Sequence, residues 1–321
     1  MTFEPKTRLS KRPIASLLIG VMLAGIGFGC TTVKDAAKGT ARTISDTTRK
    51  ATDILTPAGS SLKHRLAVIG MEAAADSGRS GFGAKFSKEF SELLQTQCPG
   101  LLVDEAMGAF MKYPPRLSSG PIDGYSLAMI GRPAGINYFV IGSLTDVRLE
   151  SEKTGFWLWK DTRYKIRATL RVEIVDTATG SKALDDSSWD EMMVEAMKYE
   201  ELEAAGAIPL SEVAPILDRL VQEAAQTSCA LLRAQPWRGF ITAADPNRIT
   251  LSAGRAIGLS EGALLEVFNK GRVVESKDGQ RFLMPGEKIA EARIQSLSAD
   301  QAEAVLSPPV PVGPGATVRL K

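Results

Sequence analysis

Strict alternation of apolar and polar side chains makes residues 163–175 the clearest predicted element of the chain. Apolar residues from Tyr164 to Ile174 occupy every second position, and the positions between them are mostly charged. Because side chains of a β-strand point alternately to opposite faces, this pattern predicts a half-buried antiparallel strand. Residues 176–180 are expected to turn the chain, and residues 181–193 to return as the next strand.

Weaker patterns surround this strand and complete a first domain. Short apolar runs predict further core strands at residues 65–70, 101–103 and 137–143. Apolar positions at helical spacing predict helices at residues 82–94, 125–130 and 213–232. We therefore expect residues 63–235 to form an α+β domain in which helices lie on one face of a mixed sheet.

The remaining residues, 236–321, contain only short strand patterns separated by Gly-rich and Pro-rich turns. The predicted strands are at residues 239–243, 248–252, 264–268, 272–275, 288–297, 302–306 and 316–320. Many short strands without an intervening helix are typical of a small all-β barrel, which is the prediction for this second domain.

The first residues of the chain have the pattern of a secretory signal. A basic stretch precedes an uncharged apolar run at residues 14–28, which is too short to span a bilayer as a helix, since this takes about 20 residues. Small Gly29 directly precedes Cys30, as lipoprotein processing requires, although Gly27 and Phe28 depart from the usual lipobox. The alternatives are an uncleaved anchor and a plain signal peptide with an incidental cysteine.

We therefore expect residues 1–29 to be a lipoprotein signal peptide and Cys30 to carry the lipid. Residues 30–62, rich in Thr, Ala and alternating charge, are predicted to be a lipid-anchored spacer. Thr31, rather than Asp, follows the lipidated cysteine, which favours the outer membrane and its periplasmic face.

Composition and charge exclude several classes of protein. The chain is 44% hydrophobic and 24% charged, an ordinary balance for a globular protein. Its formal charge is +2, and the leader carries four basic residues and one acidic residue, so its removal leaves −1. A protein this close to neutrality has no electrostatic footprint for nucleic acid, and we expect no nucleic-acid partner.

Short phrases in both domains resemble known envelope families. Residues 66–69 (LAVI), 135–143 (GINYFVIGS) and 170–180 (LRVEIVDTATG) resemble the curli secretion lipoprotein family and the TolB amino-terminal domain. The spacing of Gly254, Gly258 and Gly262 before Leu265 resembles the carboxy-terminal barrel of the flagellar H-ring protein. The three glycines are expected to form tight turns between barrel strands.

The resemblance implies a lipid-anchored structural or partner-binding protein of a cell-envelope assembly, with an envelope protein or further copies of itself in a ring as partner. A subunit of a curli-type outer-membrane secretion channel and an activator of a peptidoglycan synthase are the alternatives. A channel needs membrane-spanning strands with alternating apolar residues, whereas residues 148–162 (RLESEKTGFWLWKDT) are mostly polar. The hairpin expected there therefore argues against a pore.

Two surface features are candidate contact sites. Phe156, Trp157, Leu158 and Trp159 form an apolar segment that we expect to contact a partner or the membrane, or else to fold back onto the sheet. The basic side chains of Arg163, Lys165, Arg167 and Arg171 either meet an acidic partner or form ion pairs with Asp185, Asp186 and Asp190 on the next strand. The second interpretation is favoured.

The sequence contains few residues that are candidates for catalysis. The only histidine, His64, is expected to lie outside the folded core, so no Ser/His/Asp set forms, and we predict no enzyme, no metal site and no cofactor. Residues 78–83 are glycine-rich but lack the lysine and the spacing of a phosphate-binding loop. Cys98 and Cys229 are either a disulfide or two buried thiols.

Overall fold

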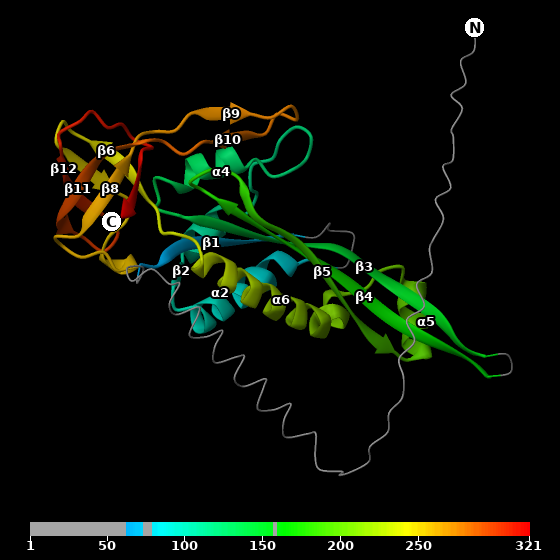
Figure 1. Ribbon diagram of the computed structural model, residues 1–321. Coiled ribbons are helices and arrows are strands. Elements are labelled where there is room, and N and C mark those ends of the chain that lie inside the picture. Colours follow the sequence, from blue (N-terminus) through cyan, green and yellow to red (C-terminus); the bar gives the residue numbers. More distant parts are fainter. Residues whose placement is uncertain (1–61, 73–78, 157–158) are drawn as a thin grey trace, which may run out of the picture. The chain divides into compact units, whose positions relative to one another are not determined.

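The first half of the molecule is built on a five-stranded sheet with the strand order β2-β1-β3-β4-β5. Its strands are β1 (His64–Met71), β2 (Leu101–Val103), β3 (Tyr138–Phe156), β4 (Trp159–Asp176) and β5 (Lys182–Val194). β1 runs parallel to β2 and β3, whereas β4 is antiparallel to β3 and β5. The computed structural model describes residues 62–72, 79–156 and 159–321 (Figure 1).

Helices cover this sheet unequally. The two long helices, α2 (Phe82–Gln97) and α6 (Leu210–Arg233), pack together on one face, where the even-numbered residues of β1 and β4 form the larger core. The shorter α4 (Gly124–Gly131) packs on the other face against Phe139 and Ile141 of β3. The predicted fold class, an α+β sheet domain followed by a small barrel, is confirmed.

The core between α2 and the sheet is built around three phenylalanines. The ring centroids of Phe82 and Phe86 are 5.8 Å apart, and those of Phe86 and Phe90 are 5.0 Å apart. All three side chains are fully buried. A Cβ atom at Gly142 of β3 would lie 2.2 Å from the ring of Phe86, so only glycine leaves room for this ring against the sheet.

β3 and β4 extend beyond the rest of the sheet. β5 pairs with β4 only as far as Tyr164, and β1 pairs with β3 only as far as Ser143. Within the described part of the chain, residues 152–156 and 159–163 therefore pair only with each other, and we name this two-stranded segment the β3–β4 arm (Figure 1). The sequence patterns predicted strands only at residues 137–143 and 163–175, which was too short, because the strands continue through this polar segment.

The second half contains a closed barrel of six antiparallel strands in the order β11-β12-β7-β6-β13-β8. They are β6 (Gly239–Ala244), β7 (Arg248–Leu251), β8 (Leu264–Phe268), β11 (Lys288–Leu297), β12 (Ala302–Ser307) and β13 (Thr317–Leu320). Small and branched side chains such as Ala292, Ala304, Leu265 and Val318 fill its interior. Small residues suit the interior of a narrow barrel.

One predicted barrel strand does not belong to the barrel. β9 (Val273–Glu275) pairs with β10 (Arg281–Leu283) in a separate two-stranded hairpin. The predicted glycine turns are present: Gly258 and Gly262 have φ angles of 99° and 80°, which favour glycine. Between Gly254 and Gly258 lies the short 3₁₀ helix η2 (Arg255–Ile257).

Two short helices have no counterpart among the predicted elements. α3 (Glu105–Phe110) follows β2, and the Asp104 side chain caps it by accepting a hydrogen bond from the Met107 N–H. α5 (Ala196–Ala205) follows β5 and buries only Leu202. The described residues belong to one compact unit, Pro57–Lys321. The predicted signal peptide (1–29) and all but the last residue of the spacer (30–62) lie outside the described residues.

Candidate functional site

The β3–β4 arm carries the predicted aromatic segment at its end. Phe156 and Trp159 are the last paired residues of β3 and β4. Trp157 and Leu158 lie outside the described residues, as do the side chains of Phe156 and Trp159 and the whole of Cys30. The described flanks of the arm are exposed and charged at Glu152, Lys153, Asp161 and Arg163. The predicted contact by this segment therefore stays a prediction.

The predicted basic strand face is largely neutralised within the sheet. The Lys165 ammonium lies 3.0 Å from carboxylate oxygens of both Glu152 and Glu191. The Arg171 guanidinium donates two hydrogen bonds of 2.8 Å to Asp185. The hydrogen bonds from Arg171 hold the pKa of Asp185 at about 2. These ion pairs favour a solvated sheet face over an acidic partner.

The pairing register of β4 with β5 shows which of the predicted acidic residues lie on the basic face. Asp185 is paired with Glu173 across the strands, on the same face as Arg171. Asp186 and Asp190 are paired with Val172 and Ala168, which face the helices. Asp190 instead forms an ion pair with Arg219 of α6. The prediction that Asp186 and Asp190 neutralise the basic face was therefore wrong, because adjacent residues of a strand lie on opposite faces.

The glycine-rich loop before α2 is not arranged to hold a phosphate. Gly78 lies outside the described residues, whereas Gly81 is the residue that caps the helix. A carboxylate oxygen of Glu72 accepts a hydrogen bond of 3.0 Å from the Gly81 N–H. A carboxylate of the chain itself thus occupies the position at which an anion would meet this helix end.

Cys98 and Cys229 form a disulfide that joins the end of α2 to α6. Their Cα atoms are 5.9 Å apart, within the range that a disulfide spans, and 131 positions separate them in the sequence. The sequence left a disulfide and two buried thiols as alternatives, because the packing of the two helices against each other could not be read from it.

His64 lies inside the fold, contrary to the expectation. It is the first residue of β1 and is 5% exposed. Its Nε2 lies 3.1 Å from the Gln235 carbonyl oxygen, and its ring meets that of Tyr138 edge-on with centroids 5.5 Å apart. Burial lowers the pKa of His64, so the neutral imidazole is favoured. The residue packs as part of the core.

A groove of about 560 Å³ lies between α2 and α3 at the carboxyl end of β1. The chain leaves β1 through α2 to reach β2 on one side, and then leaves β2 through α3 and α4 to reach β3 on the other. In open sheets of this kind, the crevice at such a reversal of strand order is the usual place for a ligand. The sequence patterns did not predict it.

Close backbone contacts form the floor of this groove. A Cβ atom at Gly70 would lie 1.9 Å from the Gly83 carbonyl oxygen, and one at Gly108 would lie 2.5 Å from the Val68 carbonyl oxygen. These glycines, visible in the sequence, let both helices approach β1. The walls carry the acidic residues Glu72, Glu92 and Glu105 and the basic residues Lys88 and Lys112. The mixed charges and the carboxylate-capped helix ends do not select an anion.

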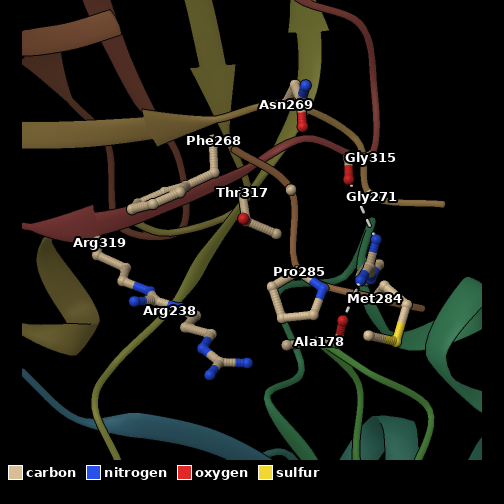
Figure 2. A pocket seen from close by; sticks show the side chains of 12 residues that line it. Ala178, Arg238, Phe268, Asn269, Gly271, Met284, Pro285, Gly315, Thr317 and Arg319 are labelled. Atoms are coloured by element: carbon tan, nitrogen blue, oxygen red, sulfur yellow. Dashed lines mark hydrogen bonds between the residues drawn. The ribbon is translucent and has the colours of Figure 1, made fainter. Parts of the chain in front are cut away.

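A buried arginine joins the sheet domain to the barrel. Arg132 follows α4 and is 6% exposed. Its guanidinium donates hydrogen bonds to the carbonyl oxygens of Thr177 at 2.8 Å and Gly315 at 3.1 Å, and also to that of Ala178. Figure 2 shows the bonds to Gly315 and Ala178 as dashed lines. Burial lowers the pKa of Arg132, which has only carbonyl oxygens as hydrogen-bond acceptors.

Further buried polar contacts tie the same two parts together. The Asn137 side chain accepts a hydrogen bond of 2.9 Å from the Arg65 N–H and donates one of 2.6 Å to the Arg238 carbonyl oxygen. The Ser252 hydroxyl of the barrel donates to the Arg132 carbonyl oxygen at 2.9 Å. We name Arg132, Asn137, Thr177 and Ser252 the junction network. The sequence patterns did not predict this network.

The described residues form neither a membrane-spanning helix nor a cluster of metal ligands. Among the described residues, no helix is both long enough and apolar enough to cross a bilayer. In the same residues, no three histidine, cysteine, aspartate or glutamate side chains are grouped so that they could hold a metal ion.

No protein-family model and no curated protein matches the chain. Several solved structures are similar to part of it. A hypothetical protein of Chlamydia trachomatis is 16% identical with a TM-score of 0.33, and the match covers 54% of this chain and 99% of that one. A minor lipoprotein of Acinetobacter baumannii is 10% identical (TM-score 0.25, 53% and 92% covered). A lipoprotein of Neisseria meningitidis is 13% identical (TM-score 0.25, 48% and 99% covered). Similarities of this size carry no conclusion about function.

Proposed function

We propose that this chain is a lipid-anchored, non-catalytic protein on the periplasmic face of the outer membrane, and that it binds a protein partner through the tip of the β3–β4 arm. The signal-like leader ending at Gly29 and Cys30 supports the anchor. The disulfide between Cys98 and Cys229 supports export, because disulfides persist in oxidising compartments such as the periplasm. The burial of the only histidine supports a role without catalysis.

The observation that carries the partner-binding role is the length of the arm. A two-stranded hairpin that leaves its sheet gains little stability from its own pairing. Residues 152–156 and 159–163 nevertheless continue the pairing of β3 with β4 and present the segment from Phe156 to Trp159 at the end. Tryptophan and phenylalanine are the residues that most often anchor protein interfaces.

Charge on the arm favours a protein over a membrane surface as the partner. From Glu152 to Arg163 the chain carries two acidic and three basic side chains, so the arm has a net charge of only +1. Segments that bind anionic bilayers combine apolar anchors with an excess of lysine and arginine. The same polar arm residues do not fit a membrane-spanning hairpin, which argues against the secretion-channel alternative.

The lipid anchor predicts that the protein is labelled when cells grow on radioactive palmitate. We expect label in the wild type, recovered with outer membranes on a density gradient, and none in Cys30→Ser, because the thiol is the acylation site. Thr32→Ser is the matched control and keeps the label. An unlabelled wild type would show that the leader is processed in another way and would refute the anchor.

The arm predicts a partner-binding defect when its tip is made polar. A photo-crosslinking amino acid at Leu158 should form an adduct with one envelope protein, to be identified by mass spectrometry, whereas the same residue at exposed Gln295 of the barrel should not. Binding of the purified partner should weaken by at least about tenfold in Trp157→Ser/Trp159→Ser, since interface tryptophans contribute about 2 kcal/mol or more.

The control for this experiment is Lys153→Ser, which changes an exposed side chain of the arm and should leave the affinity unchanged. An adduct with a second copy of the chain would indicate a ring, and an adduct with a peptidoglycan synthase would indicate its activation. Adducts with lipid alone, or equal affinity of the tip variant, would contradict binding of a protein by the arm.

A further inference from the structure

Positive charge accumulates beside the junction network without matching negative charge. Arg132, Arg238 and Arg319 all line one small cavity between the sheet domain, the outer face of the barrel and the base of the β9–β10 hairpin. Among the described residues, the only carboxylate within 4 Å of any of these guanidinium groups is that of Asp176, 3.7 Å from Arg238. The charge of Arg238 repels those of Arg132 and Arg319, and such repulsion destabilises a fold unless an anion compensates it.

Asp176 and Glu266 supply only part of this compensation. Asp176 accepts hydrogen bonds from the Ala178 N–H at 2.7 Å and the Thr179 hydroxyl at 3.2 Å, and burial raises its pKa. Glu266 lies opposite Arg319 on the neighbouring strand, but its carboxylate pairs with Lys288 at 2.7 Å. Three guanidinium groups thus share two carboxylates, each of which also has other partners.

The guanidinium groups of Arg238 and Arg319 have N–H donors without an acceptor among the described residues. Each of the three guanidinium nitrogens of Arg132 donates one hydrogen bond, whereas the side chains of Arg238 and Arg319 donate none within the described residues. Arg319 lies over the Phe268 ring, with its guanidinium carbon 4.8 Å from the ring centroid, so its position is held by packing. Figure 2 shows these two side chains together on one side of the cavity, near Thr317.

We propose that this cavity binds a small tetrahedral oxyanion of the phosphate or sulfate class between Arg238 and Arg319. Its volume of about 20 Å³ admits about one water-sized group, so one anion oxygen enters while the others stay at the open side. Two planar guanidinium forks and the Thr317 hydroxyl offer more donors than a two-oxygen carboxylate accepts, and four oxygens match them better. The bound charge offsets the repulsion beside the junction.

Calorimetric titration of the detergent-solubilised mature protein with inorganic phosphate tests this site, at constant ionic strength set with sodium chloride. The wild type should bind one phosphate per chain, and sulfate should compete. Arg319→Gln should weaken binding at least about tenfold, because the variant loses a positive charge and its charge-assisted hydrogen bonds to the anion. Arg248→Gln, an exposed barrel arginine that does not line the cavity, is the matched control and should bind as the wild type does.

A second titrant, glycerol 3-phosphate, distinguishes the source of the anion. Binding at least as tight as that of inorganic phosphate, with the same loss in Arg319→Gln, would indicate a phosphate carried by a lipid headgroup or another ester. Weaker binding would indicate the free ion. No binding by the wild type, equal affinity in Arg319→Gln with circular dichroism showing intact folding, or equal competition by chloride would overturn the proposal.

Discussion

Removal of the disulfide between Cys98 and Cys229 should lower the free energy of unfolding by about 5 kcal/mol. The cysteines are 131 positions apart in the sequence, so the link closes a long loop and lowers the chain entropy of the unfolded state. Cys98→Ala/Cys229→Ala is the suitable variant, because alanine places no polar hydroxyl at the fully buried Cys98 position. A loss of this size is a large fraction of the stability of an ordinary domain.

Urea unfolding followed by circular dichroism measures this effect. The wild type in reducing buffer should lose about as much stability as the double variant, and reductant should not affect the double variant further. The double variant in reducing buffer is the control, since it has no link between α2 and α6 to reduce. Equal midpoints for oxidised and reduced wild type would show that the bond contributes nothing to stability.

The same disulfide illustrates what the sequence can and cannot predict. Apolar spacing placed Cys98 at the end of one helix and Cys229 in another, and both helices are present as α2 and α6. Whether the two helices touch depends on their both packing on the same face of the sheet, which follows from the strand order. No local sequence pattern reveals the strand order. The sequence therefore could not decide whether Cys98 and Cys229 form a disulfide or remain two thiols.

The alternation of apolar and polar residues predicted a strand correctly where one of its faces is buried. It did not predict the strand where both faces are exposed to solvent. From Tyr164 to Ile174, β4 packs on α6, and the apolar side of the pattern is the buried side. In the β3–β4 arm neither face meets a core, so polar residues occupy both faces and no period of two remains. The predicted strands at residues 137–143 and 163–175 therefore do not reach into the arm.

The junction network could not be predicted from the sequence, because its contacts leave no pattern along the chain. The acceptors of Arg132 are main-chain carbonyl groups, which every residue carries, and they come from residues 177, 178 and 315. A buried arginine without a carboxylate partner leaves no charge pattern along the chain. Gly70, Gly83 and Gly108 were visible as residues, yet their role in the floor of the groove depends on contacts between segments far apart in the sequence.

Substitution of Arg132 should uncouple the barrel from the sheet domain. In Arg132→Met, the carbonyl groups of Thr177, Ala178 and Gly315 lose their buried donor, while the apolar length of the side chain is kept. Leaving several buried acceptors without a partner should cost about 3 to 5 kcal/mol. Because Gly315 belongs to the barrel end of the chain, part of this loss falls on the contact between the two domains, and unfolding should no longer be one transition.

Differential scanning calorimetry of the mature protein separates these effects. The wild type should unfold in a single transition, whereas Arg132→Met should show two, with the earlier one at a lower temperature than that of the wild type. Arg255→Met is the matched control, because this exposed arginine reaches a single carbonyl oxygen, that of Leu297, and should cost no more than about 0.5 kcal/mol. A single transition at the wild-type temperature in Arg132→Met would show that Arg132 does not hold the domains together.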